Sequence, residues 1–251
     1  MVEENRADAV VAAATGATVV YPSGTMALDD VSMTLKPREL VAVVGPSGCG
    51  KSTLLRLLAG LTTPTRGAIT APTDGVGIVF QQPTLLPWRT VLMNVALPLE
   101  LAGAPAGQAT ARSLATLARV GLADFARAYP SELSGGMRMR AALARALVTS
   151  PQVLLLDEPF SSLDELTREQ LAEEMTTLRA LEGFAAVLVT HSVAEAVYLA
   201  DRVLVMRARP GRIVAEIAVP FGRGRPAELR AEPAFAKLTG QVSRTLRSAA
   251  A

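Results

Sequence analysis

The spacing of apolar and polar positions changes twice along the chain. In the first third, short β-type runs alternate with turns of Pro, Gly and Asp, the pattern of strands joined by tight connections. This pattern predicts strands over residues 18–21, 31–35, 40–44, 67–70 and 77–80. One helix, which begins at Lys51, interrupts them.

The middle of the chain, from Trp88 to Ser150, is rich in Ala and Leu and predicts helices in place of strands. Helix breakers divide it at Pro98, at residues 103–105, at Gly121 and at Pro130. We interpret this stretch as a helical insert between two parts of one α/β unit.

Strand–helix–strand alternation follows after Ser150. It predicts strands over 153–156, 185–189, 203–206 and 213–219, and helices over 165–181 and 193–199. Such alternation implies a mainly parallel sheet whose strand ends carry the chemistry. In the last segment the charges are scattered rather than clustered, so we expect a solvated terminal helix rather than a lipid-binding one. These charges are Arg223, Arg225, Arg230, Arg244 and Arg247.

Composition narrows the setting. Half of the 251 residues are hydrophobic, yet no uninterrupted apolar run approaches the roughly 20 residues of a membrane span, so any membrane role must come through a partner. The acidic start at Met1 to Glu4 and the short apolar run 9–14 do not fit an export signal. A single Cys excludes a disulfide framework and favours a reducing cytoplasm. The net charge of +2, with arginines spread along the chain, argues against a nucleic-acid surface.

A phosphate-binding pattern directly follows the apolar run 40–44, and a predicted helix follows the pattern. Its glycines let the backbone N–H groups turn inward around phosphates, and the helix dipole points its positive end at the same anion. Lys51 supplies a charge for the terminal phosphates, and the Ser52 hydroxyl is placed to ligate magnesium. The chain therefore binds a nucleoside triphosphate through Gly45, Pro46, Ser47, Gly48, Cys49, Gly50, Lys51, Ser52 and Thr53.

The cysteine in this loop has two interpretations. The helix N-terminus and Lys51 would favour the thiolate form of Cys49, so that its alkylation would block nucleotide binding. Alternatively, Cys49 is a buried and inert thiol.

Two adjacent carboxylates, Asp157 and Glu158, end the buried strand over 153–156. Asp157 at the strand tip can hold the magnesium shell, and Glu158 can polarise the attacking water. A carboxylate pair at a strand end can also be a helix N-cap, but a neighbouring phosphate loop favours the catalytic interpretation.

A second anion-binding motif lies between these two elements. Ser134 can cap a helix whose apolar stripe includes Met139, Leu143 and Leu147, and Ser134-Gly135-Gly136 forms a backbone nest for an anion. With this motif, residues 21–219 resemble the nucleotide-binding subunit of an ATP-binding-cassette (ABC) transporter. In that family this signature loop contacts ATP held by the opposite subunit, so the resemblance implies a homodimer around two ATP.

The resemblance assigns further site residues. Gln81 corresponds to the loop glutamine that senses magnesium and the attacking water, and Asp164 to the loop that crosses to the other subunit. His191 corresponds to the γ-phosphate switch histidine, although a lone His is more often structural. Tyr21 corresponds to the aromatic that stacks on adenine, although a Tyr at a strand end is commonly core.

The resemblance also implies the fold class: α/β, a P-loop NTPase core with a mainly parallel sheet, an N-terminal antiparallel β subdomain and a helical subdomain insert. We expect one ABC ATPase domain over 1–251, with the core at 1–87 and 151–219, the helical subdomain at 88–150 and a short C-terminal tail at 220–251. Three residues depart from the family pattern. Met137 replaces a usual Gln, Ser162 a usual Ala, and Arg38 a usual Gly, so the turn at Arg38 is expected to differ.

The implied function is ATP hydrolysis, with Mg²⁺, at the cytoplasmic face of the inner membrane. The chain would be a peripheral subunit bound to separate permease subunits that an extracytoplasmic solute-binding protein serves. Residues 85–88 resemble importers for nitrate, sulfonates and taurine, or they form a proline-broken turn that packs on the insert. A soluble ABC ATPase acting on ribosomes or DNA is the first alternative, but such proteins usually pair two cassettes or carry coiled-coil inserts. A P-loop kinase is the second, although the chain shows no acceptor-substrate domain.

Overall fold

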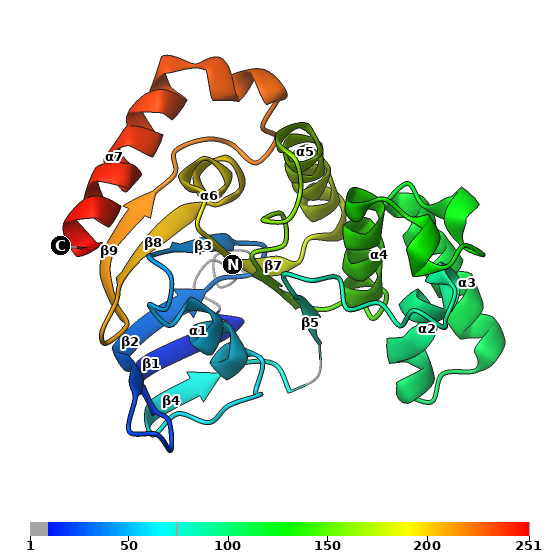
Figure 1. The fold of residues 1–251 in the computed structure, drawn as a ribbon, viewed down its shortest axis with the longest axis horizontal. Coiled ribbons are helices and arrows are strands. Elements are labelled where there is room, and N and C mark those ends of the chain that lie inside the picture. The colour runs from blue at the N-terminus through cyan, green and yellow to red at the C-terminus, as the bar shows by residue number, and fades with distance from the viewer. Residues whose placement is uncertain (1–9, 74, 251) are drawn as a thin grey trace, which may run out of the picture.

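The structure, a computed structural model, describes residues 10–73 and 75–250, so Met1 to Glu4 lie outside the described residues. It consists of an α/β lobe with a smaller helical lobe at one side (Figure 1). Two sheets lie in the α/β lobe, and their strand order is β5-β6-β7-β3-β8-β9 in one and β2-β1-β4 in the other. The expected α/β class is therefore confirmed.

The larger sheet is parallel except at one edge. Its strands are β5 (Val76–Val79), β6 (Val153–Asp157), β7 (Ala185–Thr190), β3 (Leu40–Val44), β8 (Arg202–Arg207) and β9 (Arg212–Ala218). Only β9 runs antiparallel to its neighbour, β8. Because parallel strands end at the same edge, this sheet gathers the loops that follow β3, β5, β6 and β7.

The smaller sheet is antiparallel and covers the other side of α1 (Lys51–Leu58) from the central sheet (Figure 1). It contains β1 (Ala12–Val20), β2 (Met26–Leu35) and β4 (Arg66–Thr70). The expected antiparallel subdomain is therefore present.

Two hydrophobic cores lie on opposite faces of the central sheet, and β3 contributes side chains to both. Its Leu40, Ala42 and Val44 pack into the core beneath the helices, whereas Val41 and Val43 pack toward α1 and the small sheet. All of these side chains are fully buried. Burial on both faces explains why the strand is an unbroken apolar run rather than an alternating one.

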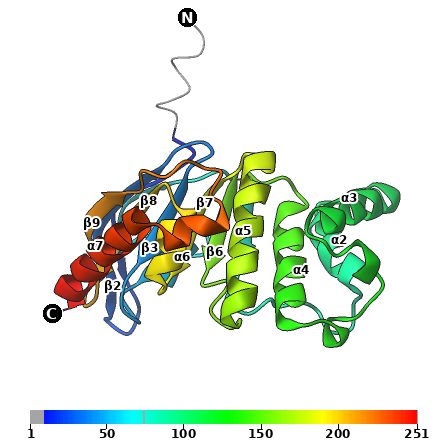
Figure 2. The ribbon, with the colours of Figure 1, turned by 90° about the horizontal axis from the view of Figure 1, so that it is seen from above.

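The helical lobe contains α2 (Val91–Leu101), α3 (Ala106–Arg119) and α4 (Gly135–Leu147), with 3₁₀ turns at Ala123–Phe125 and Pro130–Glu132. Seen from above, α4 lies beside α5 (Glu165–Glu182), and α2 and α3 lie farther out (Figure 2). The expected break at Pro98 is wrong, because Pro98 lies inside α2. Packing of α2 against α3 and α4 outweighs the local cost of the proline.

The C-terminal segment packs onto the core rather than extending from it. After α6 (Val193–Leu199) and β9 come a 3₁₀ turn at Ala227–Ala231 and α7 (Pro233–Ala250), which lies against α6 and β8. The expectation that its arginines are solvated is wrong for Arg225, which is 5% exposed. The guanidinium of Arg230 also packs, 3.6 Å from the centre of the Tyr198 ring.

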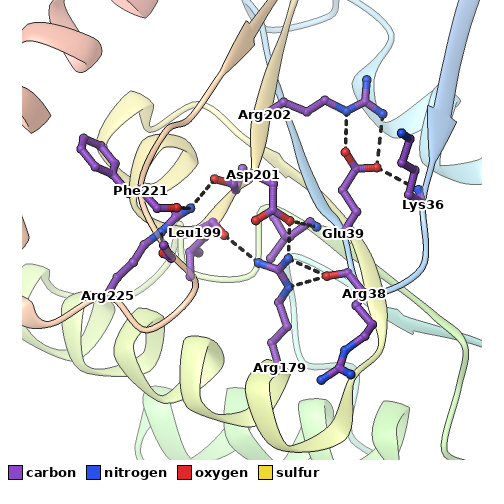
Figure 3. A network of polar contacts seen from close by, with 12 residues as sticks. Lys36, Arg38, Glu39, Arg179, Leu199, Asp201, Arg202, Phe221 and Arg225 are labelled. Atoms are coloured by element: carbon purple, nitrogen blue, oxygen red, sulfur yellow. Dashed lines mark hydrogen bonds and ion pairs between the residues drawn. The ribbon is translucent and has the colours of Figure 1, made fainter. Parts of the chain in front are cut away.

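The buried arginine closes the C-terminal end of α6. Arg225 donates hydrogen bonds to the carbonyls of Val197, Tyr198 and Ala200. From α5, Arg179 approaches the same end, where it donates to the Leu199 carbonyl and pairs with Asp201 (Figure 3). The last carbonyls of a helix lack internal partners and carry partial negative charge, so buried cations satisfy them.

The turn before β3 keeps a backbone that suits glycine. Arg38 has a φ of 62°, in the left-handed region, although an arginine stands there. Arg179 holds it in place, because its Nε donates to the Arg38 carbonyl at 3.2 Å.

Candidate functional site

A cavity of about 620 Å³ opens at the carboxyl edge of the central sheet, within the range that small-molecule sites occupy. The turn between β1 and β2, the phosphate loop and three strand-end loops contribute to its wall. The lining residues are Tyr21, Thr25, Met26, Ala27, Ser47, Gly48, Gly50, Lys51, Ser52, Thr53, Gln81, Glu158 and Arg209. Nine of them come from the sequence-based set of site residues, namely Tyr21, Ser47, Gly48, Gly50, Lys51, Ser52, Thr53, Gln81 and Glu158.

The phosphate loop between β3 and α1 has the backbone that its glycines predict. Gly48 and Gly50 have φ values of 74° and 96°, which residues with a Cβ rarely adopt. At Gly45 the constraint is space, because an added Cβ would lie 2.5 Å from the Cys49 Sγ. Such left-handed turns make a concave backbone suited to anions.

Lys51 spans this loop. Its side chain is buried, and its Nζ donates to the carbonyls of Gly45 at 2.9 Å and Pro46 at 3.2 Å. An ammonium group has three N–H donors, so one is left for an acceptor in the cavity. Since α1 begins at Lys51, the positive end of the helix dipole adds to the same field.

Ser52 and Asp157 form an oxygen pair beside the cavity. The Ser52 Oγ donates to the Asp157 Oδ1 at 3.0 Å, joining α1 to the tip of β6. Burial raises the pKa of the Asp157 carboxyl, and the hydrogen bond from Ser52 opposes this rise. Hydroxyl and carboxylate oxygens are the ligands that Mg²⁺ prefers.

Glu158 has a left-handed backbone. Its φ is 47°, a conformation that costs energy in a residue with a Cβ and that recurs at functional sites. The Glu158 N–H donates to the Val189 carbonyl at 2.9 Å, and the Ser161 hydroxyl donates to the Glu158 carbonyl at 2.9 Å. Its side chain meets His191, whose Nδ1 lies 2.9 Å from Oε2.

Other predicted site residues do not line this cavity. Three of them belong to the phosphate loop but do not face the cavity, namely Gly45, Pro46 and Cys49. Two more contact residues that line the cavity: Asp157 contacts Ser52, and His191 contacts Glu158. Cys49 is 1% exposed, and burial raises the pKa of its thiol despite the nearby Lys51 charge. The thiolate interpretation of Cys49 is therefore wrong, because desolvation outweighs the attraction to the cation.

The signature loop and the Asp164 loop form a second surface, outside the cavity. Ser134 caps α4 as expected, since its Oγ accepts from the Met137 N–H at 3.2 Å. Asp164 caps α5, and hydrogen bonds from Thr167 lower the pKa of its carboxyl. An added Cβ at Gly136 would lie 2.7 Å from the Thr167 Cγ2, so α4 and α5 approach closely there. The roles predicted for Ser134, Gly135, Gly136 and Asp164 toward a second subunit stay predictions.

Tyr21 lines the cavity from the turn that follows β1. Its Oη lies 3.1 Å from the Thr53 Oγ1, so the phenol is tied to the start of α1. The ring is partly exposed, which leaves a face for stacking against a base. Stacking on adenine stays a prediction.

Sequence reasoning missed Arg209, which reaches the cavity from the turn between β8 and β9. This turn packs on the phosphate loop, because an added Cβ at Gly211 would lie 2.2 Å from the Cys49 carbonyl oxygen. The Arg-Pro-Gly run at 209–211 predicts a turn, but no local pattern indicates what that turn packs against.

Across residues 10–73 and 75–250, no helix combines the length and apolar character that a membrane span needs.

Comparisons with known proteins agree with this arrangement. The family described as ABC transporter matches residues 28–161. The taurine import ATP-binding protein TauB of Rhizobium johnstonii is 44% identical over 240 residues, which cover 91% of this chain and 92% of that protein. The aliphatic sulfonates import ATP-binding protein SsuB 1 of Mesorhizobium japonicum is 48% identical over 221 residues, covering 86% and 81%. The dimeric structure of MJ0796, titled a bacterial ABC transporter cassette, superposes with a TM-score of 0.74 at 31% identity, covering 84% of this chain and 100% of that one.

Proposed function

The chain belongs to the ABC transporter family, and we propose that it is the ATP-hydrolysing subunit that drives solute import through separate membrane permease subunits. One observation carries this proposal. Lys51 and Ser52 meet Glu158, from a distant part of the chain, at a single cavity, and Ser52 bonds Asp157 beside it.

Each group has a task in phosphoryl transfer to water. The loop backbone, Lys51 and Thr53 hold the phosphates, and Tyr21 stacks on the adenine. Glu158 accepts a proton from the attacking water, and Gln81 orients that water. His191 holds the Glu158 carboxylate through Nδ1 and contacts the γ-phosphate. Catalysis of this kind is mostly positioning and electrostatic stabilisation.

The residues present fit a magnesium ion that arrives with ATP. Ser52, Asp157 and Gln81 offer oxygen ligands, and Mg²⁺ is commonly held by one or two carboxylates together with substrate phosphates. In keeping with this, the described residues include no group of three or more His, Cys, Asp or Glu that could hold a metal ion by themselves. Bound there, the ion would neutralise charge that develops on the phosphate oxygens.

A second copy of the chain completes the site. Ser134, Gly135, Gly136 and Asp164 lie outside the cavity of their own chain, at the starts of α4 and α5. Ser134 and Asp164 are exposed, whereas Gly135 is half-buried and Gly136 is buried. Facing another copy, the α4 start would present a backbone nest to the terminal phosphate. The dimeric form of MJ0796 supports such pairing in a related cassette.

A groove between the two lobes supports a permease partner. It has a volume of about 320 Å³, and its lining includes Phe80, the residue directly before Gln81. Its apolar wall combines β5 residues with the exposed side of α2, and includes Ile78, Phe80, Leu97, Pro98 and Leu101. Leu101 is 79% exposed there, and an exposed apolar groove of this kind favours a protein partner. A permease held there would place the chain, as a peripheral subunit, at the cytoplasmic face of the inner membrane.

The relatives' names, which mention taurine and aliphatic sulfonates, support small sulfonated solutes. We expect an extracytoplasmic solute-binding protein to deliver them. The test is reconstitution of the chain with the permease encoded beside it in proteoliposomes that contain ATP. We expect solute-dependent phosphate release and uptake of labelled taurine or an alkyl sulfonate, both abolished by Lys51→Ala. Phosphate transfer to a small molecule in place of water, or full hydrolysis without any membrane partner bound, would contradict the proposal.

A further inference from the structure

A network of polar contacts joins two loops of the proposed catalytic site, the loop between β6 and α5 and the loop between β7 and α6. One member is Arg168 on α5. Its Nη2 donates to the Leu163 carbonyl at 2.9 Å and its Nε to the Phe160 carbonyl at 3.3 Å. Both carbonyls belong to the loop between β6 and α5, which begins at Glu158 and ends at Asp164. Arg168 therefore holds that loop from within its own chain.

The other member is Glu195 on α6, an acidic residue that is only 8% exposed. Its Oε2 accepts from the Thr190 Oγ1 at 2.6 Å, and its backbone N–H donates to the Ser192 Oγ at 3.3 Å. The Ser192 N–H in turn donates to the Thr190 Oγ1 at 3.0 Å. The Glu195 carboxylate therefore holds Thr190, and its backbone N–H bonds the Ser192 cap of α6, on the other side of His191.

An ion pair connects the two members, because the Arg168 Nε lies 3.4 Å from the Glu195 Oε1. The network closes at Glu158, which receives the Ser161 hydroxyl on its carbonyl from one loop and His191 on its carboxylate from the other. We propose that Arg168 and Glu195 are a positioning pair, which fixes the Asp164 loop against the His191 loop and thereby sets the geometry of the Glu158–His191 contact.

Stability alone does not explain this pair, because burying its two charges costs desolvation free energy. Desolvation raises the pKa of the Glu195 carboxyl, with the hydrogen bond from Thr190 and the Arg168 charge acting in the opposite direction. Replacing a buried ion pair by apolar residues is often neutral or stabilising for a fold. Because each member of the pair bonds a loop that bears site residues, we infer that the pair serves to fix the position of these loops.

The inference rests on the proposed function, since it concerns the geometry of that same site. Its test uses the full chain with Arg168→Gln, Glu195→Gln and the double variant. Arg168 also provides a matched control, because it forms a second ion pair, at 2.9 Å, with Glu165, whose side chain is 73% exposed. Glu165→Gln therefore makes the same chemical change on the exposed partner of the same arginine.

Two measurements are made on each variant: kcat and KM for ATP, and hydrogen–deuterium exchange over residues 159–164 and 190–192. Each single variant should lower kcat roughly tenfold, as expected for a lost charged hydrogen bond, with KM changed less than about twofold. The double variant should lose less than the product of the two single losses, because both members share one ion pair. Exchange should rise in both loops together, and Glu165→Gln should change neither measurement.

Additive losses in kcat, an effect confined to KM, or faster exchange in one loop alone would overturn the inference. A variant that unfolds is recognised by exchange across the whole chain, and Arg168→Lys then serves as the conservative replacement, with partial rescue of kcat expected. If the parent chain does not hydrolyse ATP, yet both loops loosen together in the variants, the proposed function fails while the pairing of the loops stands.

Discussion

The Nδ1 of His191 lies 2.9 Å from the Oε2 of Glu158, across the ends of two neighbouring parallel strands. The left-handed backbone of Glu158 turns its carboxylate toward this contact rather than into the next helix, whose start Asp164 caps instead. Glu158 is thus a carboxylate at the cavity with a histidine partner, the arrangement of a base whose orientation is set by a second group.

Glu158→Gln should remove most hydrolysis and spare nucleotide binding. The amide keeps the size of the side chain but cannot accept a proton, and general-base assistance is typically worth about 10²–10⁴-fold in rate. Phosphate release at saturating ATP, together with calorimetric titration of ATP, measures the two effects. Asp164→Asn, an acid-to-amide change outside the cavity, should leave the affinity of one chain for ATP unchanged. Parental turnover in Glu158→Gln would show that another group is the base.

Alkylation of Cys49 should be slow in the folded chain. Because burial raises the pKa of this thiol, its thiolate fraction at any given pH is lower than in the unfolded chain. At about pH 8 we expect iodoacetamide to label the native protein at least ~10-fold more slowly than the protein in urea, followed by mass spectrometry. Equal rates would mean that Cys49 is accessible. ATP should offer little further protection, because the thiol is already covered.

These results show which features the sequence could predict. Local periodicity sufficed where an element is specified by its own residues, and the predicted helix over 193–199 matches α6 in both bounds. The phosphate loop was predictable for the same reason, since its glycines and Lys51 are contiguous. Pro98 was misjudged because packing on α3 and α4, rather than local propensity, holds α2. The burial of Arg225 and of Cys49, and the position of Arg209, depend on segments far apart in the sequence.

Arg225→Met should destabilise the chain strongly, although Arg225 lies in the segment expected to be a solvated tail. The substitution leaves the carbonyls of Val197, Tyr198 and Ala200 without their donor at a buried helix end. Burial lowers the pKa of Arg225 only to about 10, so the native side chain is charged at neutral pH. Urea unfolding should give a loss of at least ~2 kcal/mol in the free energy of unfolding.

The exposed neighbour Arg223 provides the control for this measurement. Arg223→Met should change the free energy of unfolding by less than about 0.5 kcal/mol. Equal effects of the two substitutions would contradict the role of Arg225 at the end of α6.

Arg209→Ala should weaken ATP binding. Arg209 lines the cavity, and among the described residues it has no hydrogen-bond or ion-pair partner, so its charge is free to act on the nucleotide. For a partly exposed cation near a polyanion we expect a roughly three- to tenfold rise in Kd, by titration calorimetry, that shrinks as salt is added. Arg207→Ala removes the same charge from the same hairpin outside the cavity and should have a smaller effect. An unchanged Kd in Arg209→Ala would place this side chain outside the binding site.

Leu101→Asp should weaken binding to the permease without affecting nucleotide binding. Leu101 lies in the groove between the lobes, and a buried charge at an apolar contact is costly. Leu181 on α5 is 75% exposed and lies outside this groove, so Leu181→Asp is a matched control. Co-purification with detergent-solubilised permease should fall at least ~10-fold for Leu101→Asp alone. Equal recovery of both variants would move the docking surface elsewhere.

The proposed pairing of two copies traps nucleotide between the cavity of one and the Ser134 and Asp164 loops of the other. Sedimentation of Glu158→Gln, with and without saturating ATP and Mg²⁺, tests it most directly, because this variant should hold ATP without consuming it. We expect a single chain without nucleotide, a pair with ATP, and loss of the pair when Ser134→Arg is added. A variant that stays single at saturating ATP, with a parent chain whose rate per molecule does not depend on its own concentration, would contradict it.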